Sequence, residues 1–227
     1  MPARPKKKAN VAAIGPRAAK RAARSPRKRT DEIIEAAAVV FAERGYHGAS
    51  TQDIADRLHM RQATLYYYFP SKDAALELVC QRGVAGFVEM AESLAATADS
   101  PPEKIGKIMR AHLQALEEKH AFVKVFLNER LYLGDDARKT IGRLSRRYEL
   151  IIQRVFESGV ETGVLRADLN CRLATLALLG VCNAATNWYG KEPGATVSAI
   201  AKNFVDIILN GVRAPAGPVA HHRQRHD

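Results

Sequence analysis

The amino-acid sequence of 227 residues predicts an all-α fold. From Thr30 to Val212, apolar residues recur at steps of three and four, which is the period of helices that bury one face. No segment alternates apolar and polar residues as a half-buried strand does. Glycine and proline stand between the periodic segments, for example at Gly45 and Pro70, where one helix ends before the next begins.

Four helices are predicted in the first part of the chain. Thr30 is expected to cap the first, because its hydroxyl oxygen can accept a bond from a backbone N–H, and Gly45 is expected to end it. Ser50 or Thr51 begins the second helix, and Asp53 can complete a capping box with Ser50. The predicted spans are 30–44, 51–58, 62–69 and 71–95.

Five further amphipathic segments follow two adjacent prolines, Pro101 and Pro102. They predict helices over 103–118, 120–132, 136–162, 169–189 and 196–212. The third of these segments shows the helical period most clearly, in the apolar series Ile141, Leu144, Tyr148, Ile151, Ile152, Val155, Phe156 and Val160.

The positive charge of the chain is concentrated at its N-terminus. Of the 35 lysine and arginine residues, 11 lie in residues 1–29, which hold no acidic residue, so the other 198 residues carry 24 basic and 24 acidic side chains. Residues 1–29 have almost nothing to bury, so we expect a disordered basic arm. Either the arm is a solvated tail, or it strengthens nucleic-acid binding by contacting phosphates without reading sequence. A transit peptide would also be basic, but its usual serines are nearly absent here.

Composition excludes several classes of protein. No apolar run approaches the ~20 residues of a membrane-spanning helix, and the N-terminus lacks the apolar core of a signal peptide. Cys80, Cys171 and Cys182 are an odd set without the close spacing of metal ligands or of a disulfide framework. We therefore expect a cytoplasmic protein without membrane contact.

Two short predicted helices joined by a tight turn, after a longer helix, form a helix-turn-helix pattern. Its expected core residues are Phe41, Ile54, Ala55, Leu58, Leu65 and Phe69. With these facing inward, the outer face of the third helix presents Gln62, Ala63, Tyr66 and Tyr67, which could enter a major groove. Thr51 and Gln52 open the second helix, where free backbone N–H groups suit a phosphate, and Lys72 opens the fourth.

Thr30–Val79 contains the runs FAERGYHGASTQDIADRL and TLYYYFPSKDAAL. These runs resemble the TetR family of bacterial transcriptional repressors. The resemblance implies a cytoplasmic homodimer that binds double-stranded DNA at a palindromic operator and releases it when a small effector changes the separation of the two recognition helices. It implies a helix-turn-helix DNA-binding domain at 30–75, after the disordered basic arm at 1–29, and a ligand-binding and dimerisation domain at 76–213. The composition of residues 214–227, with two prolines and three histidines, predicts a disordered tail.

The DNA-contact positions of the family fall on Thr51, Gln52, Gln62, Ala63, Thr64, Tyr66, Tyr67, Tyr68 and Lys72. Thr51, Tyr66 and Lys72 are the expected phosphate contacts. Gln62 is the expected base reader, because its amide can pair with adenine N6 and N7. Tyr68 could equally pack inward.

This chain departs from the family pattern around the turn. His59, Arg61 and Ala63 stand where the family usually has a glycine, a small polar residue and often a second glycine. His59 must then adopt a turn conformation that glycine reaches easily. Arg61 adds a cation that either faces the phosphates or guanine edges, or is simply solvated beside the DNA.

The segment 103–212 contains no catalytic pattern, so we expect neither an enzyme nor a cofactor. His112 and His120 lack a third ligand, so a metal site is not expected. Cys171 and Cys182 share a helix face, for which packing is a simpler explanation than redox sensing.

The runs LATLALLGVCNAATNWY and IAKNFVDIILNG resemble the C-terminal domain of TetR-family regulators of fatty-acid and steroid breakdown. This second resemblance implies an acyl-CoA thioester as effector and a four-helix dimer seam. The expected seam residues are Leu176, Gly180, Ala184, Trp188, Ile200, Phe204 and Ile207. The candidate effector-binding residues are Phe87, Met90, Leu113, Phe122, Phe126, Tyr132, Arg147, Phe156, Asn183 and Asn187.

These candidates have simpler alternatives. Each apolar one could be plain core, and Arg147, with Arg143 and Arg146, could form a solvated helix face. Asn183 and Asn187 could make a structural hydrogen bond across the dimer.

The leading hypothesis is an effector-released repressor of lipid or steroid catabolism. The first alternative is a repressor of drug efflux that responds to a hydrophobic or cationic drug, for which Glu89 and Glu129 could supply negative charge. The second is a non-specific architectural DNA-binding protein, suggested by the arm alone. The helix-turn-helix segment 30–75 has four basic and seven acidic side chains, so we expect the arm to supply most of the electrostatic affinity for DNA.

Overall fold

The structure, a computed structural model, describes residues 26–213, and within them it confirms the all-α prediction. The elements are α1 (Pro26–Gly48), α2 (Thr51–Arg57), α3 (Gln62–Leu65), α4 (Lys72–Ala95), α5 (Pro101–Glu118), α6 (His120–Glu129), η1 (Arg130–Tyr132), α7 (Asp135–Glu161), α8 (Cys171–Ala184), η2 (Ala185–Asn187) and α9 (Val197–Val212). The expected tail at 214–227 and the first 25 residues of the expected arm lie outside the described residues.

The predicted starts of the second and fourth helices are confirmed. Ser50 caps α2, where its hydroxyl accepts from the backbone N–H of Asp53 and the Asp53 side chain accepts from the Ser50 N–H in return. Ser71 caps α4 by accepting from the N–H of Ala74. Gly45 interrupts the helical backbone of α1 with φ 69°, so the glycine breaks the helix where the sequence predicted.

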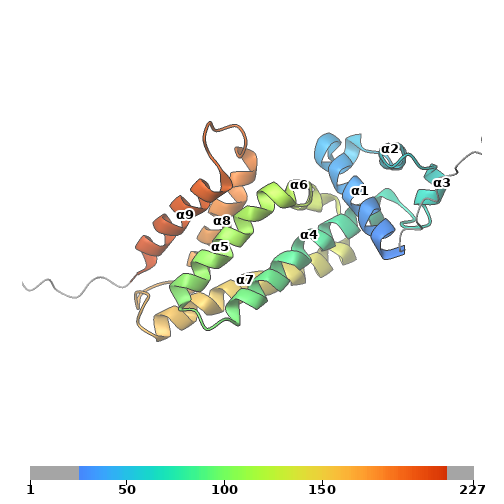
Figure 1. The fold of residues 1–227 in the computed structure, drawn as a ribbon. Helices are drawn as coiled ribbons and strands as arrows, with labels where there is room; N and C mark the ends of the chain where they lie inside the picture. Colours follow the sequence, from blue (N-terminus) through green and yellow to red (C-terminus); the bar gives the residue numbers. More distant parts are fainter. Residues whose placement is uncertain (1–25, 214–227) are drawn as a thin grey trace, which may run out of the picture.

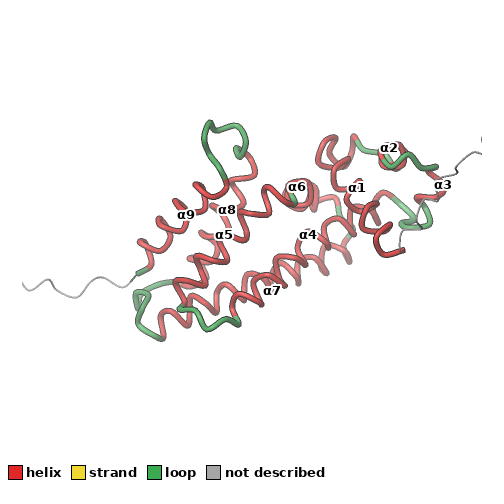
Figure 2. The backbone as a smooth tube through the Cα atoms, viewed as in Figure 1, coloured by secondary structure: helices red, strands yellow, loops and turns green. Residues whose placement is uncertain are grey.

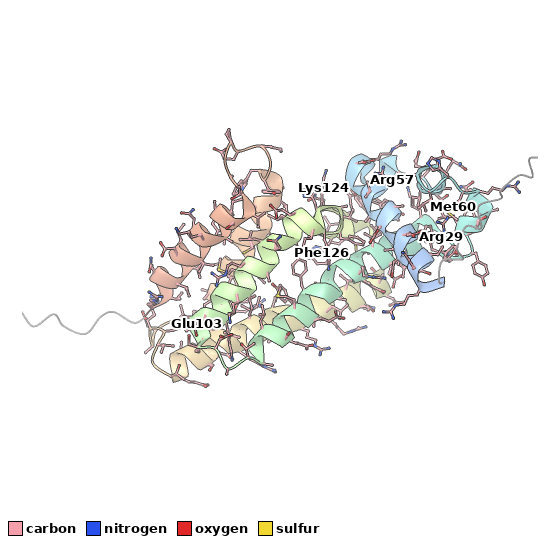
Figure 3. The ribbon with its side chains drawn as sticks, in the orientation of Figure 1. Arg29, Arg57, Met60, Glu103, Lys124 and Phe126 are labelled. Atoms are coloured by element: carbon pink, nitrogen blue, oxygen red, sulfur yellow. The ribbon has the colours of Figure 1, made fainter. Side chains whose placement is uncertain are left out.

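Two predicted helix boundaries in the helix-turn-helix are wrong, and the α-helices predicted over 120–132 and 169–189 end earlier, at Glu129 and Ala184, each followed by a 3-10 turn. α1 already includes Pro26–Arg29, so Thr30 is not its cap. Arg29 forms an ion pair with Glu32 (3.1 Å), and its guanidinium lies 3.8 Å from the sulfur of Met60, which ties this turn to the rest of the protein (Figure 3). The third helix ends at Leu65 rather than continuing to Phe69, because the backbone tightens into bonds between residues three apart, as in Tyr68 N–H to Leu65 O.

The helices form two connected bodies (Figure 1). α1, α2 and α3 gather at one end of the molecule, and the long helices α4, α5 and α7 lead away from them. α4 packs along α7, α5 packs along α9, and α6 packs against both α1 and α4. The loops after α4 and after α7 lie together at the end of the long helices away from α1–α3 (Figure 2).

The hydrophobic interior has two clusters, which divide within α4 between Val84 and Val88. The first cluster contains the expected helix-turn-helix core of Phe41, Ile54, Ala55, Leu65 and Phe69, all at most 1% exposed, with Leu58 partly buried at its edge. It also takes in Val125 of α6 and Ile141 of α7. α4 is continuous through both clusters, so α4 and α6 join the helix-turn-helix to the rest of the protein. No helix of the described part is long and apolar enough to cross a membrane.

Candidate nucleic-acid interface and effector cavity

The turn between α2 and α3 is closed by two backbone bonds. The N–H of Met60 donates to Ala55 O (3.0 Å), and the N–H of His59 donates to Asp56 O (3.0 Å), which is the arrangement of a Schellman helix end. That arrangement needs a left-handed residue, and His59 has φ 51°, the only positive value at a non-glycine residue within 26–213. Glycine adopts this conformation easily, whereas a residue with a side chain is strained in it. The strain that the sequence predicts at His59 is therefore present.

Three of the expected DNA-contact side chains meet in one hydrogen-bonded cluster. The Gln62 amide Nε2 donates to the Thr51 hydroxyl (2.7 Å), which lies 3.3 Å from the hydroxyl of Tyr66. Thr51 is nearly buried, whereas Tyr66 is 47% exposed. Residues from the start of α2 and the start of α3 are thus held at one exposed surface.

The other expected contacts flank this cluster. Gln52, Arg61, Ala63, Thr64 and Tyr67 are exposed, and Tyr67 reaches 88%.

Tyr68 and Lys72 differ from the exposed contacts, because both side chains contact other parts of the protein. Tyr68 is half-buried and packs against the first hydrophobic cluster, as its inward alternative required. The Lys72 ammonium donates to Tyr46 O (2.9 Å) and Ala49 O (3.1 Å) and lies 4.3 Å from the centre of the Tyr46 ring. Lys72 therefore fastens the end of α1 to the start of α4 before any phosphate is present.

Most cations of the helix-turn-helix are already occupied. Arg44 pairs with Asp53 (2.5 Å) and Arg57 pairs with Glu43 (3.2 Å). With Lys72 bound to carbonyl oxygens, Arg61 is the one basic side chain of segment 30–75 that has no ion pair or hydrogen bond among the described residues. The surface that the sequence predicts to bind DNA thus has few basic side chains that are not already bonded within the protein.

A cavity of about 260 Å³ lies in the larger body, between α4, α5, α6, α7 and α8. Most of its wall is apolar, and it is lined by Val84, Phe87, His112, Val123, Phe126, Leu127, Arg130, Ser145, Tyr148, Glu149, Leu176, Leu179, Gly180 and Asn183. Its volume is near the lower end of ligand pockets. It can take an acyl or alicyclic group, but not a whole coenzyme.

Three of the ten candidate effector residues line this cavity, namely Phe87, Phe126 and Asn183. Met90 lines a neighbouring groove between α4 and α5. Leu113 and Phe156 are fully buried core, and Phe122 packs against the helix-turn-helix cluster.

The remaining three candidates lie elsewhere. Tyr132 stacks on Tyr46 (5.3 Å), Arg147 pairs with Glu92 (2.5 Å), and Asn187 is exposed in η2. The cavity wall depends on how the helices are rotated, so apolar spacing alone could not separate wall from core.

Sequence reasoning missed His112, the polar partner of Asn183, and Tyr148, which bonds to His112 in turn. His112 Nδ1 lies 2.9 Å from the Tyr148 hydroxyl, and His112 Nε2 lies 3.1 Å from Asn183 Oδ1. Burial lowers the pKa of His112 to about 4, so the imidazole is neutral at physiological pH. The sequence pairs His112 only with His120, as metal ligands, whereas in the structure His120 is exposed on the next helix. The sequence signal for this buried polar contact was a histidine on an otherwise apolar helix face.

Arginine side chains surround the one carboxylate of the cavity wall. Glu149 accepts from Arg172 (2.6 Å) and from Arg146 (3.1 Å). Arg130, which lines the same cavity, has no ion pair in the described part of the chain. A groove that shares Arg130, Ser145 and Glu149 with the cavity is also lined by Arg138 and Arg146. The polar end of the cavity is therefore positively charged.

α6 joins this cavity to the helix-turn-helix. Phe126 lines the cavity, and Glu129, one turn later, accepts a bond from the Tyr46 backbone N–H (2.8 Å) just after the break in α1 (Figure 3). Tyr132 then packs against Tyr46 and His47, with ring centres 5.3 and 4.5 Å apart. A shift of α6 would move the end of α1.

The outer faces of α8 and α9 carry exposed apolar side chains. Leu173, Leu176 and Ile207 are 61%, 41% and 67% exposed, and Gly180 and Ala184 on the same helix are also exposed. Of the expected seam residues, Trp188 and Phe204 are partly buried against each other. Ile200 differs from the expectation, because it is 5% exposed and packs inside its own chain, so it has little surface to offer a partner.

Comparison with known proteins matches both bodies of the chain. Residues 33–79 match the family model described as bacterial regulatory proteins, tetR family, and residues 98–212, just over half of the chain, match the tetracyclin repressor-like C-terminal domain. The chain is 29% identical to the HTH-type transcriptional repressor KstR2 of Mycolicibacterium smegmatis, over 85% of this chain and 94% of that protein.

Two solved structures are also similar. The fatty acid degradation regulator FadR of Bacillus halodurans has a TM-score of 0.71 and 28% identity, with 83% of this chain and 97% of that chain covered. AibR in complex with isovaleryl coenzyme A and operator DNA has a TM-score of 0.73 and 24% identity, covering 79% and 97%, and shows the same fold.

Proposed function

The chain belongs to the TetR family of bacterial transcriptional regulators, and from that premise we propose that it represses genes of lipid or steroid catabolism until an acyl-CoA thioester releases it from its operator. Relatives that match over most of this chain are transcriptional repressors and regulators of fatty-acid metabolism. The observation that carries the effector proposal is the apolar cavity that opens onto an arginine-lined groove.

That pairing of surfaces matches the chemistry of an acyl-CoA. The acyl group would occupy the apolar cavity, while Arg130, which has no ion pair among the described residues, would face the phosphates of the coenzyme outside it. Arg138 and Arg146, paired with Asp135 and Glu149, would exchange these partners for phosphate oxygens. A cationic drug finds no free carboxylate there, since Glu149 is already bonded to two arginines. The two other candidate acids lie outside this site: Glu89 lines neither the cavity nor the neighbouring groove between α4 and α5, and Glu129 accepts from the Tyr46 backbone.

α6 would carry the signal from effector to DNA. A ligand that displaces Phe126 moves the helix whose Glu129 holds the Tyr46 backbone. In a dimer, such a movement changes the separation of the two α3 helices. The ligand can shift this equilibrium only as far as it prefers one arrangement over the other.

We propose the exposed apolar face of α8 and α9 as the dimer seam. Leu176, Gly180, Ala184 and Ile207 are exposed in the single chain and small or apolar, as a buried four-helix seam requires. Leu173 joins them, whereas Ile200 does not. Leu176 and Gly180 also line the cavity, so the seam would lie beside it.

Gln62 is the proposed base reader. Its bond to Thr51 (2.7 Å) and a longer one to the Tyr66 hydroxyl (3.5 Å) orient the amide. The Oε1 oxygen is left for an adenine edge, and an N–H would exchange the longer bond for the adenine acceptor.

Gln62→Ala should weaken operator binding by about 1–3 kcal/mol, because one bidentate base contact is lost. Binding to random DNA should barely change. Fluorescence anisotropy with both DNAs measures the two effects. Gln114→Ala, an exposed glutamine on α5, is the control and should bind the operator normally. Equal weakening on both DNAs would assign Gln62 to the phosphate backbone instead.

The basic arm is proposed to supply most of the electrostatic affinity. Deleting residues 1–25 removes Arg4, Lys6, Lys7, Lys8, Arg17, Lys20, Arg21 and Arg24. It keeps Arg29, which pairs with Glu32 in α1.

The deletion should flatten the plot of log binding constant against log salt concentration, by about 0.9 for each arm cation that contacts a phosphate. Operator and random DNA should be affected alike. A full-length variant with these eight residues replaced by glutamine controls for arm length and should match the deletion. An unchanged slope would mean that the arm does not contact DNA.

The whole proposal is tested in two steps. An operator is first selected from random duplexes and footprinted, and it should be palindromic with a large preference over random DNA. Decanoyl-CoA should then release it and raise the melting temperature of the protein, whereas cationic dyes should do neither. Failure of every CoA thioester would reject the effector class, and absence of sequence preference would favour the architectural alternative.

A further inference from the structure

Three polar side chains from three helices meet at the wall of the cavity. His112 of α5 lies between Tyr148 of α7 and Asn183 of α8, at 2.9 and 3.1 Å. His112 and Tyr148 are each 5% exposed, and the Phe87 ring packs against both, with ring centres 4.6 and 5.7 Å apart. Burying polar groups in an apolar wall costs stability unless every group finds a partner.

The protons of this chain of bonds can be assigned. A neutral imidazole carries one N–H, and Asn183 Oδ1 can only accept, so His112 Nε2 donates to it. His112 Nδ1 then has a lone pair, which accepts from the Tyr148 hydroxyl. With the amide reversed, the Tyr148 O–H would lose its only acceptor among the described residues. His112 thus fixes the orientation of both partners.

This assignment leaves the two N–H groups of Asn183 unused. No acceptor for them occurs within residues 26–213, although Asn183 lines the cavity. Of the other polar groups of the wall, Ser145 donates to Ile141 O and Glu149 is bonded to arginines, while Arg130 is a charged donor at the polar end of the cavity. The cavity therefore presents one oriented, neutral hydrogen-bond donor.

We infer that the Asn183 amide donates to a carbonyl oxygen of the effector, with His112 and Tyr148 as positioning residues, so that the cavity selects carbonyl-bearing ligands over fully reduced ones. The inference rests on the proposed function, since it places the effector in this cavity. A carbonyl is favoured over a carboxylate because no cation lies in the His112–Tyr148–Asn183 chain. The oxygen can belong to the thioester or to a ketone on the acyl group.

Three probes distinguish these sources. Decanoyl-CoA has the thioester carbonyl, S-decyl-CoA has none, and S-(9-oxodecyl)-CoA has a ketone at the chain end. We expect one carbonyl probe to release operator DNA at concentrations roughly 10- to 100-fold lower than S-decyl-CoA does, because S-decyl-CoA would cover the Asn183 donor and leave it unpaired. The preferred probe identifies the oxygen that Asn183 contacts.

Asn183→Asp is the decisive variant, because a carboxylate can still accept from His112 but has no N–H to donate. It should lose the preference between the probes. Asn183→Leu should lose it as well, and melting temperatures establish that each variant folds. Asn187→Leu, the exposed asparagine one turn later, should keep the preference.

The outcomes separate the two proposals. If none of the probes releases DNA from the wild-type protein, the proposed function fails. If all three release it equally, or if both Asn183 variants keep the preference, the proposed function stands and this inference is overturned.

Discussion

Lowering the pH from 6.5 to 4 should reduce the free energy of unfolding by about 3 kcal/mol through His112 alone. Burial lowers the pKa of His112 from its ordinary 6.5 to about 4. Between these values the unfolded chain binds a proton at His112 that the folded protein does not. Protons therefore favour the unfolded state in this window, and the loss of stability levels off below pH 4.

Urea unfolding at several pH values and one protein concentration measures this effect. The neighbouring titratable groups do not contribute, since burial raises the pKa of both Tyr148 and Cys182 and they stay neutral throughout. Between pH 6.5 and 4, the free energy of unfolding of His112→Gln should fall by about 3 kcal/mol less than that of the wild type. Identical pH profiles for wild type and His112→Gln would contradict the assignment.

Gly159→Ala should destabilise the protein by about 1–3 kcal/mol, as overpacking of a close-packed core does. A Cβ atom at this position of α7 would lie 2.6 Å from Leu165 Cγ and 3.2 Å from Pro101 Cβ. Leu165 cannot withdraw easily, because it is 1% exposed and its N–H donates to Gly159 O (2.9 Å). Thermal unfolding would show the loss as a fall of about 2–4 °C for each kcal/mol.

Gly142→Ala, in the same helix, is the matched control and should have the opposite sign. Nothing lies within 4 Å of a Cβ atom there. Alanine restricts the unfolded chain more than glycine does, so the change should stabilise the protein by about 0.5–1 kcal/mol. Shifts of the same sign in both variants would show that the contacts around Gly159 do not limit its size.

Most of the helix-turn-helix could be predicted from the sequence, although the start of α1 and the end of α3 could not. Its caps at Ser50 and Ser71 and its break at Gly45 depend on hydrogen bonds and backbone preferences within a few residues. The strain at His59 followed from a missing glycine in the same turn. The error at Thr30 has a tertiary cause, since Arg29 contacts Met60 across the fold and α1 begins earlier than its capping signal.

The cavity could be predicted only in part. Phe87, Phe126 and Asn183 reach it, but Leu113 and Phe156 share the same apolar pattern and lie in the core. A helical period identifies the buried face of each helix and leaves open what that face meets.

The sequence by itself therefore determined the all-α fold, the family, the helix-turn-helix surface and the location of excess charge in the first 29 residues. Only the tertiary structure decided that His112, Tyr148 and Asn183 form one chain of bonds, because they lie 36 and 71 residues apart on different helices. It also decided that Ile200 turns inward while Ile207 stays exposed. Local hydrogen bonds and spacing set the first group of features, whereas the second depends on how whole helices rotate and pack against one another.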